Sequence, residues 1–220
     1  MARWAMIINL DRCIGCGACA VACGMHNHVD SNSWRRVFDC GSGPGPDRVH
    51  LYVPMSCMHC ADPPCHKVCP TTATYVRSDG IVDIDPEKCI GCGYCMVACP
   101  YLARVILYQN ETASEQARMA SDNENTLPEN TYLGVCTKCN FCRDRVEHGM
   151  SAGLVPGVDK EATPACVINC TSEALTFGDI EDADSPVRRL MAESKVCTLQ
   201  PELNTNPHLF YIHTLEEDET

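Results

Sequence analysis

Near its start the chain reads Cys13-Ile14-Gly15-Cys16-Gly17-Ala18-Cys19-Ala20-Val21-Ala22-Cys23. Seventy-six positions later it reads Cys89-Ile90-Gly91-Cys92-Gly93-Tyr94-Cys95-Met96-Val97-Ala98-Cys99, and nine of the eleven positions are identical. Both copies have the spacing C-x2-C-x2-C-x3-C and flank the second cysteine with glycines. Glycine accepts a positive φ and lets backbone N–H groups approach a bound anion. The repeat therefore predicts two loops that each present thiols to a metal cluster.

Two further cysteine groups are variants of this motif. The group from Cys57 to Cys69 widens the middle spacing by two residues, and the last group joins Cys139-Asn140-Phe141-Cys142 to Cys166-Val167-Ile168-Asn169-Cys170 after a long excursion. An alanine follows three of the groups at the same offset, at Ala73, Ala103 and Ala174. Loops of this kind hold cubane iron–sulfur clusters in bacterial ferredoxins, where the fourth cysteine of each motif ligates the other cluster. The sequence therefore predicts four [4Fe–4S] clusters in two pairs.

Cross-ligation also predicts which cysteines share a cluster. The second and third groups are close in sequence, so we expect them to pair with each other and the first and fourth groups to pair across them. The expected ligand sets are Cys57, Cys60, Cys65 and Cys99; Cys89, Cys92, Cys95 and Cys69; Cys13, Cys16, Cys19 and Cys170; and Cys139, Cys142, Cys166 and Cys23.

This pairing predicts an α+β fold of two bacterial-ferredoxin-like two-cluster units with long loops, the inner inserted in the outer. Short alternating segments before the two copies, at Ala5 to Leu10 and Ile81 to Asp85, are typical of strands. The expected divisions are an outer unit over 1–50 and 131–190, an inner unit over 51–108, a polar connecting segment over 109–130 and a C-terminal docking tail over 191–220. Within the tail, the apolar groups between Pro201 and Tyr211 suggest contact with a partner.

Three cysteines remain outside the expected ligand sets. Cys136 forms a further C-x2-C with Cys139, so five candidates compete for the four places of the last group. We expect Cys136 to be a nearby non-ligand, with its replacement of Cys139 or Cys142 left as the alternative. Cys40 and Cys197 stand alone and are expected to be small buried apolar residues.

Composition favours a metal protein. The chain has 220 residues, 19 cysteines, 6% aromatic residues and a net charge of −12. With so few aromatic residues the apolar core is expected to be small, so we expect cluster binding to supply part of the folding free energy. The acidic charge argues against nucleic acid and anionic lipid as partners, and no apolar run approaches the roughly 20 residues of a membrane helix. No nucleophile, acid–base pair or dinucleotide-binding G-x-G-x-x-G is evident, so no catalytic residue is expected.

The sequence resembles the four-cluster electron-transfer (beta) subunits of dimethyl sulfoxide reductase-type molybdopterin oxidoreductases. The resemblance rests on the motif order, on the phrases Cys57 to Pro70, Cys89 to Tyr101 and Lys138 to Arg145, and on the tail Leu199 to Tyr211. It implies a subunit of anaerobic respiration that relays electrons between a molybdenum- or tungsten-pterin catalytic chain and a membrane quinone-linked subunit. The resemblance implies a cytoplasmic or membrane-associated location through partners, with periplasmic co-export as the alternative.

Several polar residues lie beside the expected ligands. His59 and His66 fall between cysteines, but with every cysteine place filled we expect them to be packing or surface groups. Four cations are adjacent to cysteines and either raise cluster potentials or form ordinary ion pairs, namely Lys67, Lys138, Arg143 and Arg145.

Two other functions are weighed against this one. A free-standing polyferredoxin would carry the same clusters without a fixed partner. A structural zinc protein would use C-x2-C pairs, although zinc sites usually lack a third cysteine three residues on.

Overall fold

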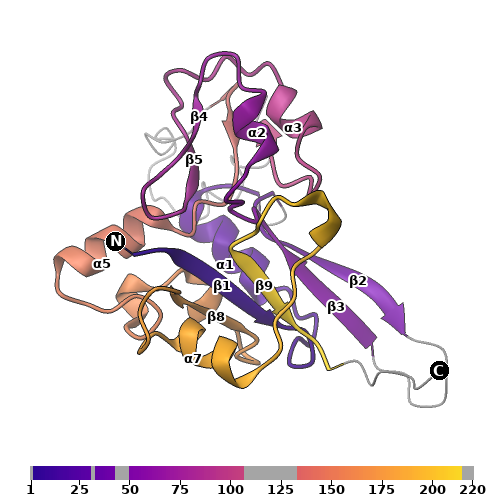
Figure 1. Cartoon of the computed structure of the whole chain (residues 1–220), viewed down its shortest axis with the longest axis vertical. Coiled ribbons are helices and arrows are strands. Elements are labelled where there is room, and N and C mark those ends of the chain that lie inside the picture. Colours follow the sequence, from indigo (N-terminus) through magenta and orange to yellow (C-terminus); the bar gives the residue numbers. More distant parts are fainter. Residues whose placement is uncertain (1, 31–32, 43–49, 107–132, 215–220) are drawn as a thin grey trace, which may run out of the picture.

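A three-stranded sheet joins the two ends of the chain (Figure 1). Strand β1 (Trp4–Asn9) lies in its middle, antiparallel to β8 (Leu175–Asp179) and parallel to β9 (Leu209–Ile212). The structure is a computed structural model, and it describes residues 2–30, 33–42, 50–106 and 133–214.

Strand β1 is buried on both faces of this sheet. Alternate residues of a strand face opposite sides, and here Ala5 and Ile7 pack under helix α7 (Pro186–Glu193). Met6 and Ile8 point to the opposite face, into the cluster of buried residues that contains most of the buried cysteines. The sheet therefore forms the wall between α7 and the cysteine-rich interior.

A two-stranded hairpin stands at the other end of the molecule. Strands β4 (Thr74–Val76) and β5 (Val82–Ile84) pair antiparallel, with the short helices α2 (Pro64–Lys67) and α3 (Tyr94–Val97) packed together beside them (Figure 1). Each of these helices carries one cysteine that the sequence marks as a ligand, Cys65 on α2 and Cys95 on α3.

The hairpin and the three-stranded sheet share one local pattern. In each, the strand that precedes a near-copy loop pairs with the strand that follows a variant cysteine group. The Asn9 N–H donates to the Ala174 carbonyl at 2.8 Å, and the Asp85 N–H donates to the Ala73 carbonyl at 2.8 Å. Both alanines are buried, so the shared offset seen in the sequence marks an equivalent tight contact.

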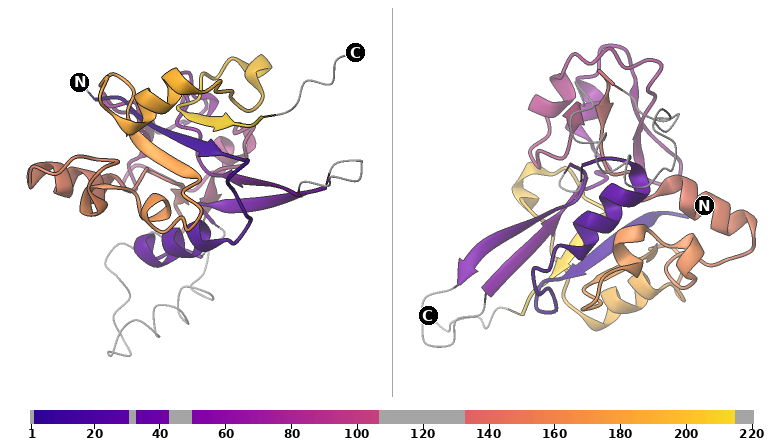
Figure 2. Two further views of the ribbon diagram at one scale, coloured as in Figure 1. Left: turned by 90° about the horizontal axis from the view of Figure 1, so that it is seen from below. Right: turned by 180° about the vertical axis from the view of Figure 1, so that it is seen from behind.

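The remaining elements connect these two regions. Hairpin β2–β3 projects from the body of the molecule, and helices α1 and α6 pack together (Figures 1 and 2). The elements are α1 (Ala18–Asn27), β2 (Arg36–Ser42), β3 (His50–Met55), β6 (Val105–Ile106), β7 (Cys136–Thr137), α5 (Arg143–Ser151), α6 (Ala165–Ile168) and the 3-10 turns η1 (Lys160–Ala162) and η2 (Pro201–Leu203).

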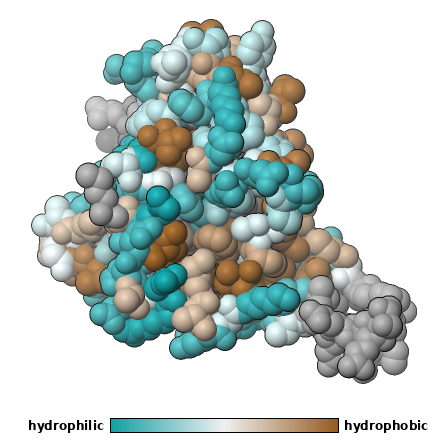
Figure 3. All heavy atoms as spheres, in the orientation of Figure 1, coloured by the Kyte–Doolittle hydropathy of each residue, from teal (hydrophilic) through white to brown (hydrophobic). Residues whose placement is uncertain are grey.

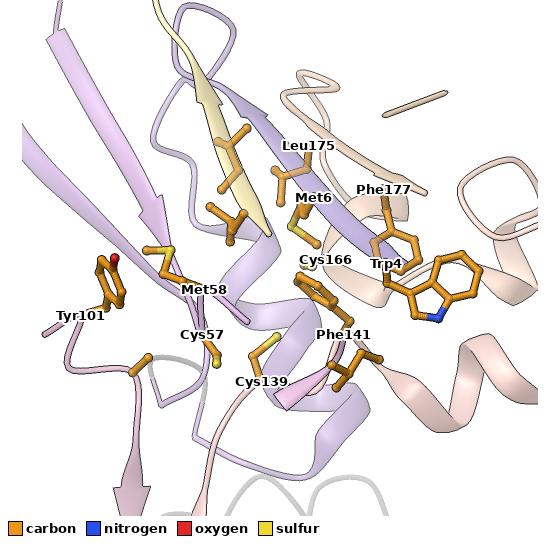
Figure 4. Packing of buried hydrophobic residues seen from close by; sticks show 14 of the residues in the cluster. Trp4, Met6, Cys57, Met58, Tyr101, Cys139, Phe141, Cys166, Leu175 and Phe177 are labelled. Carbon is orange, nitrogen blue, oxygen red and sulfur yellow. The ribbon is translucent and has the colours of Figure 1, made fainter. Parts of the chain in front are cut away.

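One buried core runs through both regions. It includes Met6 and Phe177 on the sheet side, Met58 toward the hairpin and Phe141 between them (Figure 4). Several of the buried cysteines belong to this same core.

The C-terminal stretch corrects one expectation. Leu209 and Tyr211 were predicted to dock on a partner, but they are 0% and 1% exposed and fill this chain's own core. The Tyr211 hydroxyl donates to the Pro54 carbonyl at 2.9 Å. Strand β9 completes the sheet along the free edge of β1, so these apolar groups do not distinguish a subunit from a free-standing protein.

The mixture of small sheets and short helices confirms an α+β fold. The predicted connecting segment 109–130 and the acidic end 215–220 lie outside the described residues. The domain boundaries stay a prediction. In the described ranges, no helix combines the length and the apolar character that a bilayer crossing requires.

Candidate metal centres

Four buried cysteines line a cavity between α2 and the segment after α3. This Cys57 site consists of Cys57, Cys60, Cys65 and Cys99, and its cavity has an empty volume of about 320 Å³, counting the open solvent at its mouth. Burial raises the pKa of the Cys60 thiol to about 12. Metal binding requires the thiolate, so in the absence of metal the Cys60 thiol keeps its proton.

A second cavity of about 320 Å³ lies under the near-copy loop of the hairpin region. This Cys89 site consists of Cys69, Cys89, Cys92 and Cys95, with Ile90 at its edge. Cys95 is buried, Cys69 and Cys89 are half-buried, and Cys92 is exposed. The site therefore opens to the surface at one corner.

The third set of thiols lies between α1, α5 and α6. This Cys139 site consists of Cys23, Cys139, Cys142 and Cys166, all of them buried. Burial raises the pKa of Cys23 far above its usual range, and the other three thiolates raise it further. Asn27 Nδ2 donates to the sulfurs of Cys23, at 3.6 Å, and Cys142, at 3.9 Å.

The fourth set lies where the first loop meets the end of α6. In this Cys13 site burial raises the pKa of Cys13, and the charges of Cys170 and Cys16 raise it further. Burial raises the pKa of Cys19 to about 11, with Cys13 and Cys170 again among the contributing neighbours. Cys16 is exposed, as is its counterpart Cys92.

Left-handed backbone shapes all four cysteine loops. Gly17 (φ 73°) and Gly93 (φ 77°) start helices α1 and α3, which turns Cys19 and Cys95 inward. In the variant groups non-glycine residues take this conformation, including His59 (φ 45°) and Phe141 (φ 57°). The conformation has a steric cost for such residues, and the two rings contact each other in a tilted arrangement, with centroids 3.9 Å apart.

Each of the two histidines between cysteines has a backbone partner at Nδ1, and His59 Nε2 is buried without a partner among the described residues. His59 is fully buried and accepts a hydrogen bond at Nδ1 from the Val82 N–H at 3.2 Å. Burial and the nearby cations, Lys138 first, hold its pKa well below the usual value, so the ring is neutral. His66 Nδ1 lies 2.6 Å from the Thr74 carbonyl.

Cys136 lies at the Cys89 site rather than with Cys139. Its sulfur is 3.5 Å from the Cys95 sulfur, and its N–H donates to the Cys89 sulfur at 3.3 Å. It joins the lining of that cavity as a fifth cysteine. Cys136 is therefore a fifth cysteine at the Cys89 site, and not at the Cys139 site as its spacing from Cys139 suggested.

Cys40 and Cys197 correct a second expectation, because both are exposed. Cys40 lies on β2, in the hairpin that projects into solvent. Cys197 bridges Tyr211 at the margin of the three-stranded sheet. Neither position offers a core for a small apolar side chain to fill.

The four cations beside cysteines mostly bind oxygen. Lys67 pairs with Asp62 at 2.7 Å, and Arg143 pairs with Asp83 and Asp144. The other two are Lys138, which donates to the carbonyls of Val82 and Cys139, and Arg145, which donates to those of Lys160 and Thr163. Adjacency in sequence did not bring these charges onto the thiols.

Two other arginines, which the sequence did not mark as site residues, do reach the sulfurs. Arg104 Nη2 donates to the Cys65 sulfur at 3.0 Å, and Arg35 Nη2 donates to the Cys166 sulfur at 3.5 Å. Each arginine directly precedes the strand that follows a near-copy loop, Arg35 before β2 and Arg104 before β6. That shared position is the one sequence signal that marks them.

The residues around these thiols fit iron–sulfur clusters. Thiolate is the ligand that such clusters use. Arg35 Nε and Nη1 are buried and have no hydrogen-bond partner among the described residues. Buried donors need acceptors, and cluster sulfides accept hydrogen bonds of this kind. Among the described residues, no group of three or more His, Cys, Asp or Glu side chains is placed so that it could hold a single metal ion.

Comparison with known proteins agrees with this chemistry. Residues 48–128 match a family model described as a 4Fe-4S dicluster domain, and residues 4–23 match a 4Fe-4S binding domain. A protein of Halobacterium salinarum named as the iron–sulfur subunit of a dimethyl sulfoxide reductase is 38% identical over 97% of this chain and 80% of its own length. The chain belongs to the family of iron–sulfur electron-transfer subunits of the dimethyl sulfoxide reductase type.

Relatives across the family act in different reactions. A selenate reductase subunit of Mesobacillus selenatarsenatis is 36% identical over 96% of this chain and 72% of its own length. The menaquinone reductase iron–sulfur cluster-binding subunit of Nitratidesulfovibrio vulgaris is 33% identical over 96% and 90%. Like the other members of the family, this iron–sulfur subunit transfers electrons through [4Fe–4S] clusters.

Proposed function

We propose that this subunit carries four [4Fe–4S] clusters and passes single electrons along them in one line. The sixteen proposed ligands are the four sets described above, with the fourth cysteine of each group ligating the cluster of its partner group. Support comes from the grouping of these same cysteines around two cavities and in two further groups of neighbouring thiols. Cys136 is proposed as a neighbour of the Cys89 cluster, not as a ligand.

The proposal includes two nested units. The outer unit, over 1–50 and 131–190, holds the Cys13 and Cys139 clusters, and the inner unit, over 51–108, holds the Cys57 and Cys89 clusters. The equivalent contacts in the two regions support this division: β1 pairs with β8 as β5 pairs with β4, and α1 packs on α6 as α3 packs on α2. A connecting segment over 109–130 and a C-terminal segment over 191–220 complete the proposed organisation.

The order of the line follows from which sites are neighbours. Cys57 and Cys139 lie next to each other in the core (Figure 4), and the charge of Cys57 contributes to raising the pKa of Cys139, after burial. The Cys57 and Cys139 clusters therefore meet in the middle, and the proposed order is Cys13, Cys139, Cys57 and Cys89.

The main support for this proposal is the difference in cysteine burial between the middle sites and the end sites. All eight cysteines of the two middle sites are buried, whereas each end site has one exposed and two half-buried cysteines. An electron relay needs middle clusters shielded from water and end clusters near the surface where partners dock. The exposed cysteines Cys16 and Cys92 mark the two ends.

Exposed apolar side chains at the Cys89 end support a docking role there. Ile90, Tyr94 and Val97 are 67%, 62% and 89% exposed, and Figure 3 shows apolar atoms at the upper right of the molecule, where α3 lies. Contiguous exposed apolar groups mark interaction sites. We assign one end of the line to a molybdenum- or tungsten-pterin catalytic subunit and the other to a membrane quinone-linked subunit, which would hold the chain at the membrane through its partners.

Metal analysis and redox titration of the complex purified anaerobically test the proposal. We expect about sixteen iron and sixteen acid-labile sulfide per chain, in four separately titrating one-electron centres. Iron and sulfide near half these values would contradict the four-cluster count, and zinc without sulfide would contradict electron transfer. Co-purifying chains identify the partners, and a fully loaded, monodisperse chain without any would favour a free-standing polyferredoxin.

A further inference from the structure

Two buried arginines stand out among the charged groups of the described residues. Arg35 and Arg104 are 1% and 4% exposed, and each places its guanidinium among cysteine sulfurs. Burying a charge is costly unless an opposite charge compensates it. None of the ion pairs between described residues joins either arginine to a carboxylate. The compensating negative charge therefore has to come from the thiolates and from what they bind.

Arg104 lies between the two cysteine sites of the hairpin region. Its Nη2 donates to Cys65 of the Cys57 site, and its Nη1 donates to the Thr74 hydroxyl at 3.0 Å. Its Nη1 also lies 3.8 Å from the sulfur of Cys136, which lines the Cys89 site. One guanidinium thus acts on thiols of both sites, with Thr74 fixing its position.

Arg35 lies in the same way between the two sites of the sheet region. Its Nη2 donates to Cys166 of the Cys139 site and lies 3.0 Å from the Met6 sulfur. Cys19 of the Cys13 site belongs to the same buried cluster as these two residues and lies near enough to interact with the arginine's charge. Its remaining two nitrogens are buried without a partner among the described residues. Sulfides of a bound cluster would supply acceptors for these buried donors.

The two arginines are therefore equivalent features of two regions with different sequences. Each directly precedes the strand that follows a near-copy loop, and each faces the pair of sites that the loop helps to form. Arginine keeps its proton under all ordinary conditions, so each region contains one fixed positive charge between its two sites.

We propose that Arg35 and Arg104 set the reduction potentials of the clusters, each raising the potentials of the two clusters of its own unit. This inference rests on the proposed four-cluster function. When a cluster takes up one electron its negative charge grows by one, no bond is formed or broken, and no proton is needed. A fixed positive charge beside both clusters stabilises the reduced form of each. The order of potentials along the line then depends on two residues that ligate nothing.

Redox titration of the intact complex, followed by electron paramagnetic resonance, tests this role. In Arg104→Gln we expect both inner clusters to become harder to reduce by at least tenfold in the ratio of oxidised to reduced form, about 59 mV for one electron. The outer clusters should be unchanged, and Arg35→Gln should give the converse pattern. Arg104→Lys keeps the positive charge, so the potentials of both inner clusters in this variant should lie close to those of the unsubstituted complex.

Matched controls separate this effect from a general loss of charge. Arg36 neighbours Arg35 but donates to the Tyr101 and Leu102 carbonyls, and Arg143 adjoins Cys142 but pairs with carboxylates. Arg36→Gln and Arg143→Gln should leave all four potentials unchanged. Unchanged potentials in Arg104→Gln and Arg35→Gln, with all clusters loaded, would overturn the proposal.

A second pair of variants tests the charge with the arginine in place. Thr74→Asp sets a carboxylate beside the Arg104 guanidinium, and Thr74→Asn is its uncharged match. We expect lower potentials for both inner clusters in the aspartate variant than in the asparagine variant, and equal potentials would contradict the proposal even if Arg104→Gln fails to assemble. Iron and sulfide counts on the unsubstituted complex test the four-cluster function separately.

Discussion

The two near-copy loops, Cys13–Cys23 and Cys89–Cys99, begin alike and continue differently. In both, a left-handed glycine starts a helix, but α1 runs for ten residues and α3 for four. Pro100 follows Cys99 directly, and proline cannot continue a helix because it lacks an N–H and clashes with the preceding turn. The same thiol-presenting loop is thus built into a long helix in one region and a single turn in the other.

The surroundings of the two loops differ more than the loops do. The first is supported by a three-stranded sheet with α7 behind it, and the second by a two-stranded hairpin with a fifth cysteine, Cys136, at its site. Spacing of the cysteines selects the cluster type, whereas neighbours set its potential and stability. Nearly identical ligand loops can therefore serve as two different steps of one relay.

Removal of iron should have the largest effect and should separate the two regions. The small core at the hairpin contains Val82 and Ile106 among three cysteines, whereas the sheet has aliphatic residues on both faces. We expect chelation to abolish most folded structure, with fast amide exchange throughout β4 and β5 and slower exchange in β1. Hydrogen exchange followed by mass spectrometry measures this, and equal protection in the two regions would contradict it.

Glycine substitutions should distinguish the two loops next. Gly15 (φ 71°) and Gly91 (φ 66°) are equivalent, but a Cβ at Gly15 meets the side-chain ring of Tyr52, whereas one at Gly91 meets the backbone carbonyl of Gly134, which can shift less than a side chain. We expect Gly15→Ala to cost about 1–2 kcal/mol for the left-handed backbone, and Gly91→Ala about 2–5 kcal/mol with overpacking added. Loss of cluster absorbance in increasing denaturant measures both. Gly93→Ala, which meets no atom within 4 Å, is the control, and equal costs for Gly15 and Gly91 would argue against the comparison.

Cys136→Ala should alter one cluster slightly. The Cys136 and Cys95 sulfurs are 3.5 Å apart, and a Cys95 that ligates iron is a thiolate and can only accept, so Cys136 is then the donor. Losing this weak donor should make the Cys89 cluster about twofold to fivefold harder to reduce, for roughly 0.5–1 kcal/mol. Iron content should not change. Loss of a cluster's iron would instead identify Cys136 as a ligand, and Cys40→Ala is the matched control.

Asp11→Asn should have the smallest effect, confined to the first loop. Burial raises the pKa of Asp11, but hydrogen bonds from Thr214 and His213 lower it more, so the folded value lies below the usual one. A depressed carboxyl pKa contributes stability above the unfolded value, near 3.9, and loses it as pH falls through the folded value. We expect about 0.5 kcal/mol less stability at pH 7 and no difference near pH 2. Glu87→Gln, at the equivalent exposed position, should change nothing, and an Asp11→Asn deficit that persists at pH 2 would rule out this origin.

Local features of this molecule follow from its sequence. The strands before both loops were predicted close to where β1 and β5 lie, because each is a short alternating segment next to a cysteine loop. The α+β class and the iron–sulfur chemistry likewise follow from cysteine spacing and glycine placement, which act within a few residues.

Features that depend on contacts between distant parts of the chain did not follow from the sequence. Arg35 and Arg104 reach sulfurs 131 and 39 positions away, and no local pattern encodes such a contact. The alternation of side chains in Leu209–Ile212 predicts a strand, but it does not predict which sheet the strand joins. The same residues could therefore pack against a partner or against this chain's own core. Cys136 was associated with Cys139 by spacing alone, although β7 carries it to the other end of the molecule.

Cross-ligation between the two groups of each unit is the claim on which the whole account depends. Serine variants of Cys13, Cys23 and Cys139, compared by electron paramagnetic resonance of the reduced complex, test it most directly. Cys23→Ser should change the same cluster signal as Cys139→Ser and leave the signal altered by Cys13→Ser intact. A Cys23→Ser spectrum that matches Cys13→Ser would show that each loop holds its own cluster, and would contradict the nested arrangement.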